Sequence, residues 1–123
     1  MEYKIELYEK KDGRVPVLEF IKCLNSKQQA KIYREIDLLE RFGNDLHYPH
    51  LKSIKGELHK ELKELRIVIA SDIFRIFYFM HVDNTAVLLH GIIKKTQRTP
   101  QKELDIAASR MKDYIRRTNN AMG

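Results

Sequence analysis

Polar side chains interrupt three apolar runs of this chain that are otherwise typical of β-strands. Arg66 lies within E-L-R-I-V-I, Arg75 within I-F-R-I-F-Y-F and His90 within V-L-L-H-G-I-I, and Lys94 and Lys95 follow directly. Because neighbouring strands lie about 4.8 Å apart, side chains from three strands can converge on one face of a sheet. Arginine side chains bind phosphate through charge-assisted hydrogen bonds. The spacing therefore indicates an anion-binding floor.

Two of these side chains also have a plain structural explanation. Arg66 could pair with a nearby glutamate, Glu61 or Glu64. A lone histidine such as His90 is more often a hydrogen-bonded core residue than a catalytic one. Arg75 differs, because its apolar neighbours offer a long charged side chain no evident partner. The pattern therefore favours a functional role most clearly for Arg75.

A strongly basic stretch follows the third run. Residues 94–117 contain eight lysines and arginines and three acidic residues, so they carry +5 of the chain's formal charge of +6. A solvated helix face would explain this pattern, and so would an electrostatic footprint for RNA phosphates. Thr96 and Thr99 add hydroxyl groups to the beginning of the stretch. The candidate RNA contacts in this stretch are Arg98, Lys102 and Arg110.

Composition places the chain among small basic domains. Its 123 residues fit one domain, and 43% apolar residues suffice for one core. A sequence pI of about 9.4 favours polyanionic partners: nucleic acid, ribosomes, an acidic protein or anionic lipid. A soluble protein whose basic charge has no partner is the alternative.

Secretion, membrane insertion and metal binding find little support in the residues. Charges interrupt the N-terminal segment, and no apolar run approaches the roughly 18 residues of a membrane span, so we expect a cytoplasmic protein that does not contact membranes. His47 and His50 flank Pro49 without a carboxylate at ligand spacing, and we expect no metal or other cofactor. Cys23 is the only cysteine, and we expect it to be a buried thiol on the inner side of a short helix.

The first part of the chain predicts one strand and two helices. Residues 2–8 alternate between apolar and polar side chains, which is typical of a half-buried strand. Pro16 suits the first position of a short helix. Ser26 and Gln29 have the spacing of a capping box, and the helix that they begin extends to Phe42.

The second part predicts three strands and a final helix. Breakers indicate a loop over residues 43–56, and strands follow at 62–70, 73–80 and 86–93. A helix is expected from Pro100 to about residue 117, followed by a loose tail. The expected fold is α+β, with a mostly antiparallel four-stranded sheet. The strands are apolar on both faces, which is typical of a sheet covered on both sides. We nevertheless place the helices on one face, with the last packing weakly.

These segments together resemble the phage-derived, HigB-like toxins of the RelE/ParE superfamily. The resemblance is carried by K-E-L-R-I, R-I-F-Y-F and V-L-L-H-G-I-I-K-K-T-Q-R-T-P-Q-K-E-L-D-I-A, with V-P-V-L-E-F-I near the N-terminus. It covers nearly the whole chain, and K-K-T-Q-R-T-P is its most specific piece. The resemblance implies a RelE-like fold and a toxin that enters the ribosomal A site and cuts mRNA. It also implies a cognate antitoxin, often a helix-turn-helix (HigA-like) protein, that neutralises the toxin.

The same resemblance implies a set of site residues. Arg66 matches the arginine of the family's E-L-R, and Arg75 matches the arginine before its Y-F. Further matches within the motifs are Lys94, Lys95, Tyr78 and His90. One departure is the longer link G-E-L-H-K-E-L-K-E-L-R. Its added Lys60 and Lys63 either contact RNA or belong to a solvated extension.

The mechanism that follows from this assignment needs no metal. The 2′-OH of RNA attacks the adjacent phosphate, and the protein aligns the attack and stabilises the phosphorane. The two arginines would hold the phosphate, and the twin lysines would stabilise its charge. His90 or Tyr78 would transfer the proton, and a histidine has the better ordinary pKa for this role near neutrality.

Two other classes of function stay open at this point. The superfamily includes gyrase-poisoning relatives that share the scaffold without RNase activity. A plain nucleic-acid- or protein-binding module is the third class. A neighbouring gene for a helix-turn-helix protein would support the toxin class. Primer extension on translated mRNA would separate mRNA cleavage from gyrase poisoning.

Overall fold

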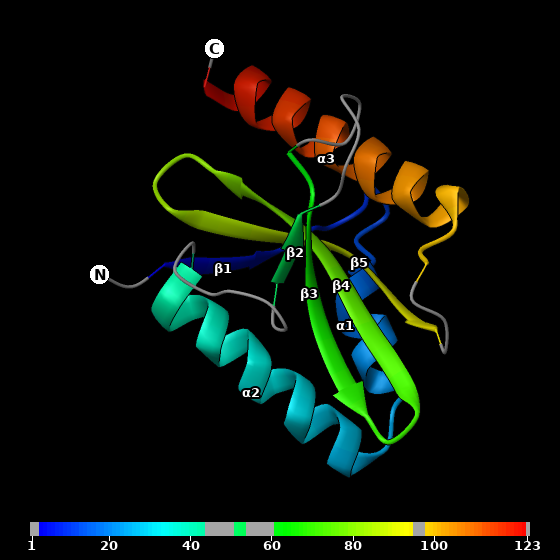
Figure 1. Ribbon diagram of the computed structural model, residues 1–123. Coiled ribbons are helices and arrows are strands. Elements are labelled where there is room, and N and C mark those ends of the chain that lie inside the picture. Colours follow the sequence, from blue (N-terminus) through cyan, green and yellow to red (C-terminus); the bar gives the residue numbers. More distant parts are fainter. Residues whose placement is uncertain (1–2, 44–50, 54–60, 95–97, 123) are drawn as a thin grey trace.

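The computed structural model describes residues 3–43, 51–53, 61–94 and 98–122. The described chain forms an α+β fold, as expected, in which one sheet lies between two layers of helices (Figure 1). In chain order the elements are β1 (Lys4–Leu7), α1 (Pro16–Lys22), α2 (Ser26–Phe42), β2 (Leu51–Ser53), β3 (Lys63–Ile69), β4 (Asp72–His81), β5 (Thr85–Lys94) and α3 (Gln101–Met122).

The sheet is mixed but mostly antiparallel. Its strand order is β1-β5-β4-β3-β2, and only the pairing of β1 with β5 is parallel. The four predicted strands are confirmed as its main part. The predicted loop over residues 43–56 was wrong in one respect, because Leu51–Ser53 pairs with β3 as a short edge strand. Three residues are too few to show a period-two pattern, so this strand had no sequence signal.

Local sequence explains where the helices begin and end. Pro16 begins α1 as predicted. The capping box of α2 lies one residue earlier than predicted. The Asn25 side chain accepts a hydrogen bond from the Gln28 backbone N–H, and the Gln28 side chain accepts one from the Asn25 backbone N–H. Asn is as good an N-cap as Ser, so both registers fit the pattern. Gly43, with a φ of 48°, ends α2 as predicted.

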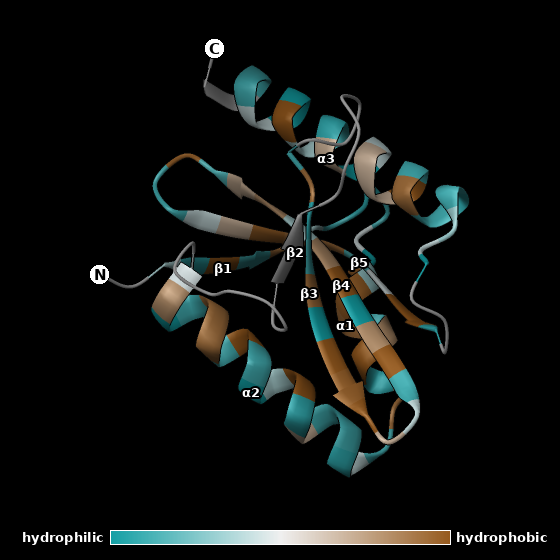
Figure 2. Ribbon diagram, viewed as in Figure 1, coloured by the Kyte–Doolittle hydropathy of each residue, from teal (hydrophilic) through white to brown (hydrophobic). Residues whose placement is uncertain are grey.

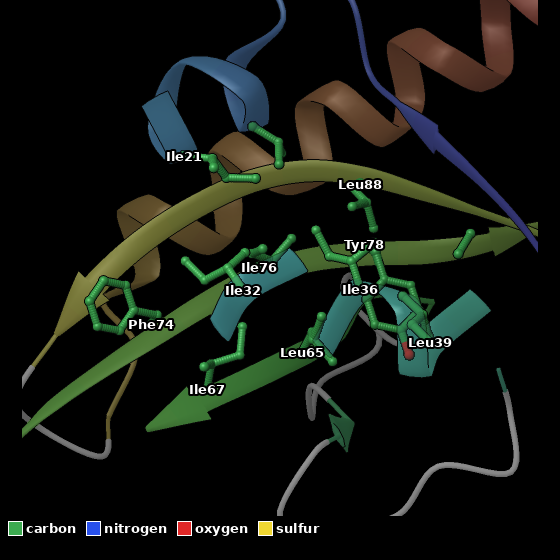
Figure 3. Close-up of a cluster of buried hydrophobic side chains, with 12 residues drawn as sticks. Ile21, Ile32, Ile36, Leu39, Leu65, Ile67, Phe74, Ile76, Tyr78 and Leu88 are labelled. Carbon is green, nitrogen blue, oxygen red and sulfur yellow. The ribbon is translucent and has the colours of Figure 1, made fainter. Parts of the chain in front are cut away.

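One hydrophobic core lies between the sheet and the pair α1 and α2. Ile32, Ile36 and Leu39 of α2 pack on the strand residues Leu65 and Ile76. Figure 3 shows these side chains between α2 and the strands. Figure 2 shows hydrophobic and hydrophilic residues alternating around α2, as expected for a helix with one buried face.

A second core lies on the opposite face of the sheet, beneath α3. Ala107, Ala108 and Met111 of α3 pack on Phe77 and Leu89. The prediction that all helices share one face was therefore wrong, and the apolar character of both strand faces was the better guide. The predicted loose tail was also wrong, since α3 continues to Met122.

Two further expectations concern the surface. Cys23 is exposed rather than buried, because α1 ends at Lys22 and Cys23 caps it outside the apolar stripe. Over the part of the chain that the structure describes, the helices are all too short or too polar to span a membrane.

Candidate functional site

Two arginines face each other across β3 and β4. Arg66 and Arg75 are register partners, so their side chains leave the sheet on the same face. This face is the one that α3 covers, because Phe77, two residues beyond Arg75, belongs to the core beneath α3. Like charges directly opposite each other on a sheet are destabilising. Both arginines are nevertheless buried here: Arg75 is fully buried and Arg66 is only 8% exposed.

A buried carboxylate and a hydroxyl group offset the charge of Arg75. The Arg75 guanidinium donates a hydrogen bond to Thr99 Oγ1 (2.6 Å), and that hydroxyl donates to Glu64 Oε1 (3.2 Å). Glu64 Oε2 also lies 3.8 Å from Arg75 Nε. Burial lowers the pKa of Arg75, the charge of Glu64 raises it, and Arg66 lowers it. Arg75 stays protonated, because the ordinary pKa of arginine is far above neutrality.

A β-bulge in β5 determines which way His90 points. Phe77 pairs with His90, but Tyr78 pairs with Leu88, so Leu89 is the extra residue on β5. In a regular strand, the neighbours Leu89 and His90 would lie on opposite faces of the sheet. The bulge instead stacks the His90 ring on Phe77, with ring centroids 6.1 Å apart. His90 therefore joins the arginines on the face beneath α3.

Two side chains of α3 bind both ring nitrogens of His90. Glu103 Oε1 lies 3.1 Å from Nε2, and a guanidinium nitrogen of Arg110 lies 3.1 Å from Nδ1. Since arginine only donates and a carboxylate only accepts, Nδ1 carries the lone pair and Nε2 the proton. Arg110 also donates to the Leu89 carbonyl (3.0 Å). The neutral His90 thus links β5 to the first turns of α3.

The surroundings of His90 lower its pKa from the ordinary 6.5, chiefly through burial. The hydrogen bond with Glu103 opposes this shift, and the positive charge of Arg110 adds to it. The unfolded chain therefore binds this proton more readily than the folded chain does. Stability from neutral His90 is present above the ordinary pKa and is lost as the pH falls below it.

We expect this linkage to be measurable by urea denaturation. Between about pH 7.5 and about pH 5.5, the wild-type protein should lose more stability than His90→Gln does. Glutamine keeps a donor and an acceptor but cannot titrate in this range. Equal pH dependence of the two proteins would contradict the assignment of neutral His90.

The side chains described so far form one cluster beneath α3: Glu64, Arg66, Arg75, His90, Thr99, Glu103 and Arg110. The other predicted residues lie at various places relative to this cluster. Lys94 pairs in register with Ile73, two residues from Arg75, which places it diagonal to Arg75 on the same face, at a typical separation of about 7–8 Å. Arg98 and Lys102 are exposed, in the segment before α3 and in its first turn. Lys60 and Lys95 lie outside the described residues, as does Thr96.

Tyr78 and Lys63 do not join the cluster. They are register partners, and Tyr78 belongs to the core beneath α1 and α2, on the opposite face. The Tyr78 hydroxyl is buried without a hydrogen-bond partner among the residues that the structure describes. Burial raises the pKa of Tyr78 well above its ordinary value of 10.0. The geometry therefore argues against Tyr78 as the acid or base, because it is buried on the face opposite Arg66, Arg75 and His90.

Sequence reasoning missed two acidic members of the cluster. Glu64 was considered only as a partner of Arg66, and the structure pairs it with Arg75; Glu103 was counted only as a negative charge. A signal for Glu103 existed. Glu103, Ala107 and Arg110 follow the helical spacing i, i+4, i+7, so they share the face of α3 that turns to the sheet.

The described residues contain no group of three or more His, Cys, Asp and Glu side chains that could hold a metal ion. What the cluster offers is cationic charge on a sheet face at the beginning of a helix. Comparison with known proteins adds a family. A family model described as phage-derived protein Gp49-like (DUF891) matches residues 19–112. No curated protein matches the chain.

Proposed function

Since the chain belongs to the Gp49-like family of phage-derived proteins, we propose that it is the toxin of a toxin–antitoxin pair and arrests translation by cutting mRNA. The observation that carries the proposal is the register pairing of Arg66 and Arg75 on one sheet face, with Lys94 diagonal to Arg75. Three cations at this spacing suit the phosphate of an RNA strand. The resemblance of the E-L-R and K-K-T-Q-R-T-P segments to HigB-like toxins supports the same reading.

In the proposed reaction, the 2′-oxygen of the RNA bonds to the adjacent phosphorus while the bond to the 5′-oxygen breaks. The 2′-OH gives its proton to water and the leaving 5′-oxygen takes one from water, which leaves a cyclic phosphate and a 5′-OH. The extra negative charge on the phosphorane is what the protein stabilises. Arg66 and Lys94 would contact the phosphate, and Arg75 would add its charge from behind Thr99.

The contacts of His90 suit a positioning role better than proton transfer. Both of its ring nitrogens are engaged by α3, and protonating Nδ1 would place a cation against Arg110. His90 would therefore hold α3, and with it Thr99 and Lys102, at the edge of the site. Lys95 keeps its proposed charge-stabilising role on the strength of the resemblance, although it lies outside the described residues.

The burial of Arg75 favours a second candidate function. With Arg75 fully buried and paired to Glu64, the scaffold could bind a target without cleaving RNA. A non-enzymatic toxin, such as a gyrase inhibitor, would fit this arrangement. The proposed partners of the enzymatic toxin are mRNA, the ribosome and a helix-turn-helix antitoxin, and such a toxin would act in the cytoplasm.

Expression of the chain in growing bacteria tests the function. We expect growth arrest, with new 5′ ends within translated mRNA detected by primer extension. Growth arrest without new ends, accompanied by loss of DNA supercoiling, would replace the nuclease with a gyrase inhibitor. Normal growth with intact mRNA and intact supercoiling would contradict both.

A further inference from the structure

A trough lined mainly by charged side chains runs between α3 and the segment that follows β1. Its two adjoining hollows measure about 650 and about 710 Å³. Tyr8 and Lys11 come from the segment after β1, while Lys102, Ser109 and Lys112 come from α3. From Lys102 to Arg116 the helix is about 21 Å long at 1.5 Å per residue. The trough therefore spans much more than one phosphate group. Figure 1 shows α3 lying across the outside of the sheet.

Hydrogen bonds hold the two walls of the trough in place. The Tyr8 hydroxyl donates to Asp113 (2.6 Å), and Arg117 donates to the Glu9 carbonyl (2.6 Å). The Arg117 guanidinium also lies over the Tyr8 ring, 5.2 Å from its centroid. These contacts join residues more than a hundred positions apart, so the trough is a built feature of the fold.

Cations dominate the lining of the trough. Two carboxylates, Asp105 and Asp113, face six cationic side chains. The cations are Lys10, Lys11, Lys102, Arg110, Lys112 and Arg116. The trough thus carries a net charge of +4, which is most of the chain's formal +6. Such a concentration of one sign attracts a polyanion.

Neighbouring groups already engage both carboxylates. Asp113 accepts from Tyr8 and pairs with Arg116 and Arg117, and Asp105 accepts from Gln101. By contrast, Lys11, Lys102 and Lys112 are exposed and form no ion pair with the residues that the structure describes. These lysines leave the trough with uncompensated positive charge.

We propose that this trough binds the phosphodiester backbone of a single RNA strand. Protein–protein interfaces are depleted of charged residues at their core and have aromatic anchors, whereas nucleic-acid interfaces are much more positively charged. Ile106 and Ala108 are the apolar side chains of the lining, and the Tyr8 ring is buried. The chemistry therefore favours RNA over an acidic protein. Contacts to the backbone alone would read no sequence.

This binding goes beyond the proposed cleavage and does not depend on it. Arg110 lines the trough and also contacts His90. An RNA strand in the trough would therefore pass beside the cluster beneath α3. The trough would hold RNA near the proposed site whether or not the protein cuts it.

Fluorescence anisotropy with a labelled 2′-O-methyl oligouridine tests the proposal on the full chain. This strand keeps its phosphates but cannot be cleaved through its 2′-OH, so binding is measured apart from cleavage. Lys11→Ala with Lys112→Ala removes one exposed cation from each wall. We expect affinity to fall on the order of 10-fold at low salt. The slope of log K against log salt, between about 50 and about 200 mM, should shrink in magnitude by about 1.4.

Lys22→Ala with Lys27→Ala is the matched control, because both lysines are exposed and belong to α1 and α2 on the other side of the sheet. An unchanged slope in this control supports the trough. The same loss in both double variants would show attraction to net charge alone and would overturn it. Polyglutamate that competes as well as RNA would also overturn it. A DNA strand that binds equally would support recognition of the phosphodiester backbone.

Discussion

Arg75→Ala is expected to lower the free energy of unfolding by about 3–5 kcal/mol, which is typical of breaking a buried ion pair from one side. The substitution leaves Glu64, only 2% exposed, without the guanidinium that lies 3.8 Å away. It also removes the donor to Thr99 and, because the Arg75 side chain is fully buried, leaves a cavity. Urea denaturation of the purified protein measures the change. Loss of activity in this variant alone would therefore not identify Arg75 as a catalytic residue.

A double variant separates the buried charge from the lost packing. Arg75→Met with Glu64→Gln removes both charges, keeps most of the volume and leaves an amide oxygen for the Thr99 hydroxyl. Buried ion pairs can often be replaced by uncharged side chains at little cost. We expect this protein to recover most of the stability that Arg75→Ala loses. A single variant as stable as the wild type would show that the pair contributes nothing to folding.

The sequence pattern was sufficient to predict the strands and helices, but not the face of the sheet on which each helix packs. The strand containing Arg66 and the strand containing Arg75 were predicted from their apolar runs, and antiparallel pairing then set the two arginines on one face. The side on which α3 packs depends on long-range contacts such as Tyr8 with Asp113, which no local pattern contains. The available clue was that the strands are apolar on both faces, which indicates a sheet covered on both sides.

The candidate site could be predicted in part for the same reason. Arg75 was recognised because a charge amid apolar neighbours stands out, whereas Glu64 was considered only as a possible partner of Arg66. His90 and Tyr78 lie on opposite faces because of the extra residue at Leu89. A bulge leaves no mark in the alternation of an all-apolar strand, so this separation needed the structure.

Growth arrest and mRNA cleavage should both depend strongly on Arg66. The stability of the fold should depend on Arg66 far less. Arg66 is 8% exposed, so unlike Arg75 it has some surface to offer a phosphate. Removing one group that stabilises transition-state charge typically lowers the rate about 100- to 1000-fold. We expect Arg66→Ala to reduce mRNA cleavage by that factor and to restore growth. Arg66→Lys should recover only part of the activity, because lysine loses the bidentate geometry.

Arg34→Ala is the control for this experiment, since Arg34 is an exposed cation of α2 on the other side of the sheet. It should arrest growth as the wild type does. Thermal unfolding of Arg66→Ala must first show a folded protein, so that lost activity is not lost structure. A folded Arg66→Ala protein that cuts mRNA at the wild-type rate would remove Arg66 from the site. The cross-strand arginine pair would then be structural, and the binding-only function would be the better account of this face.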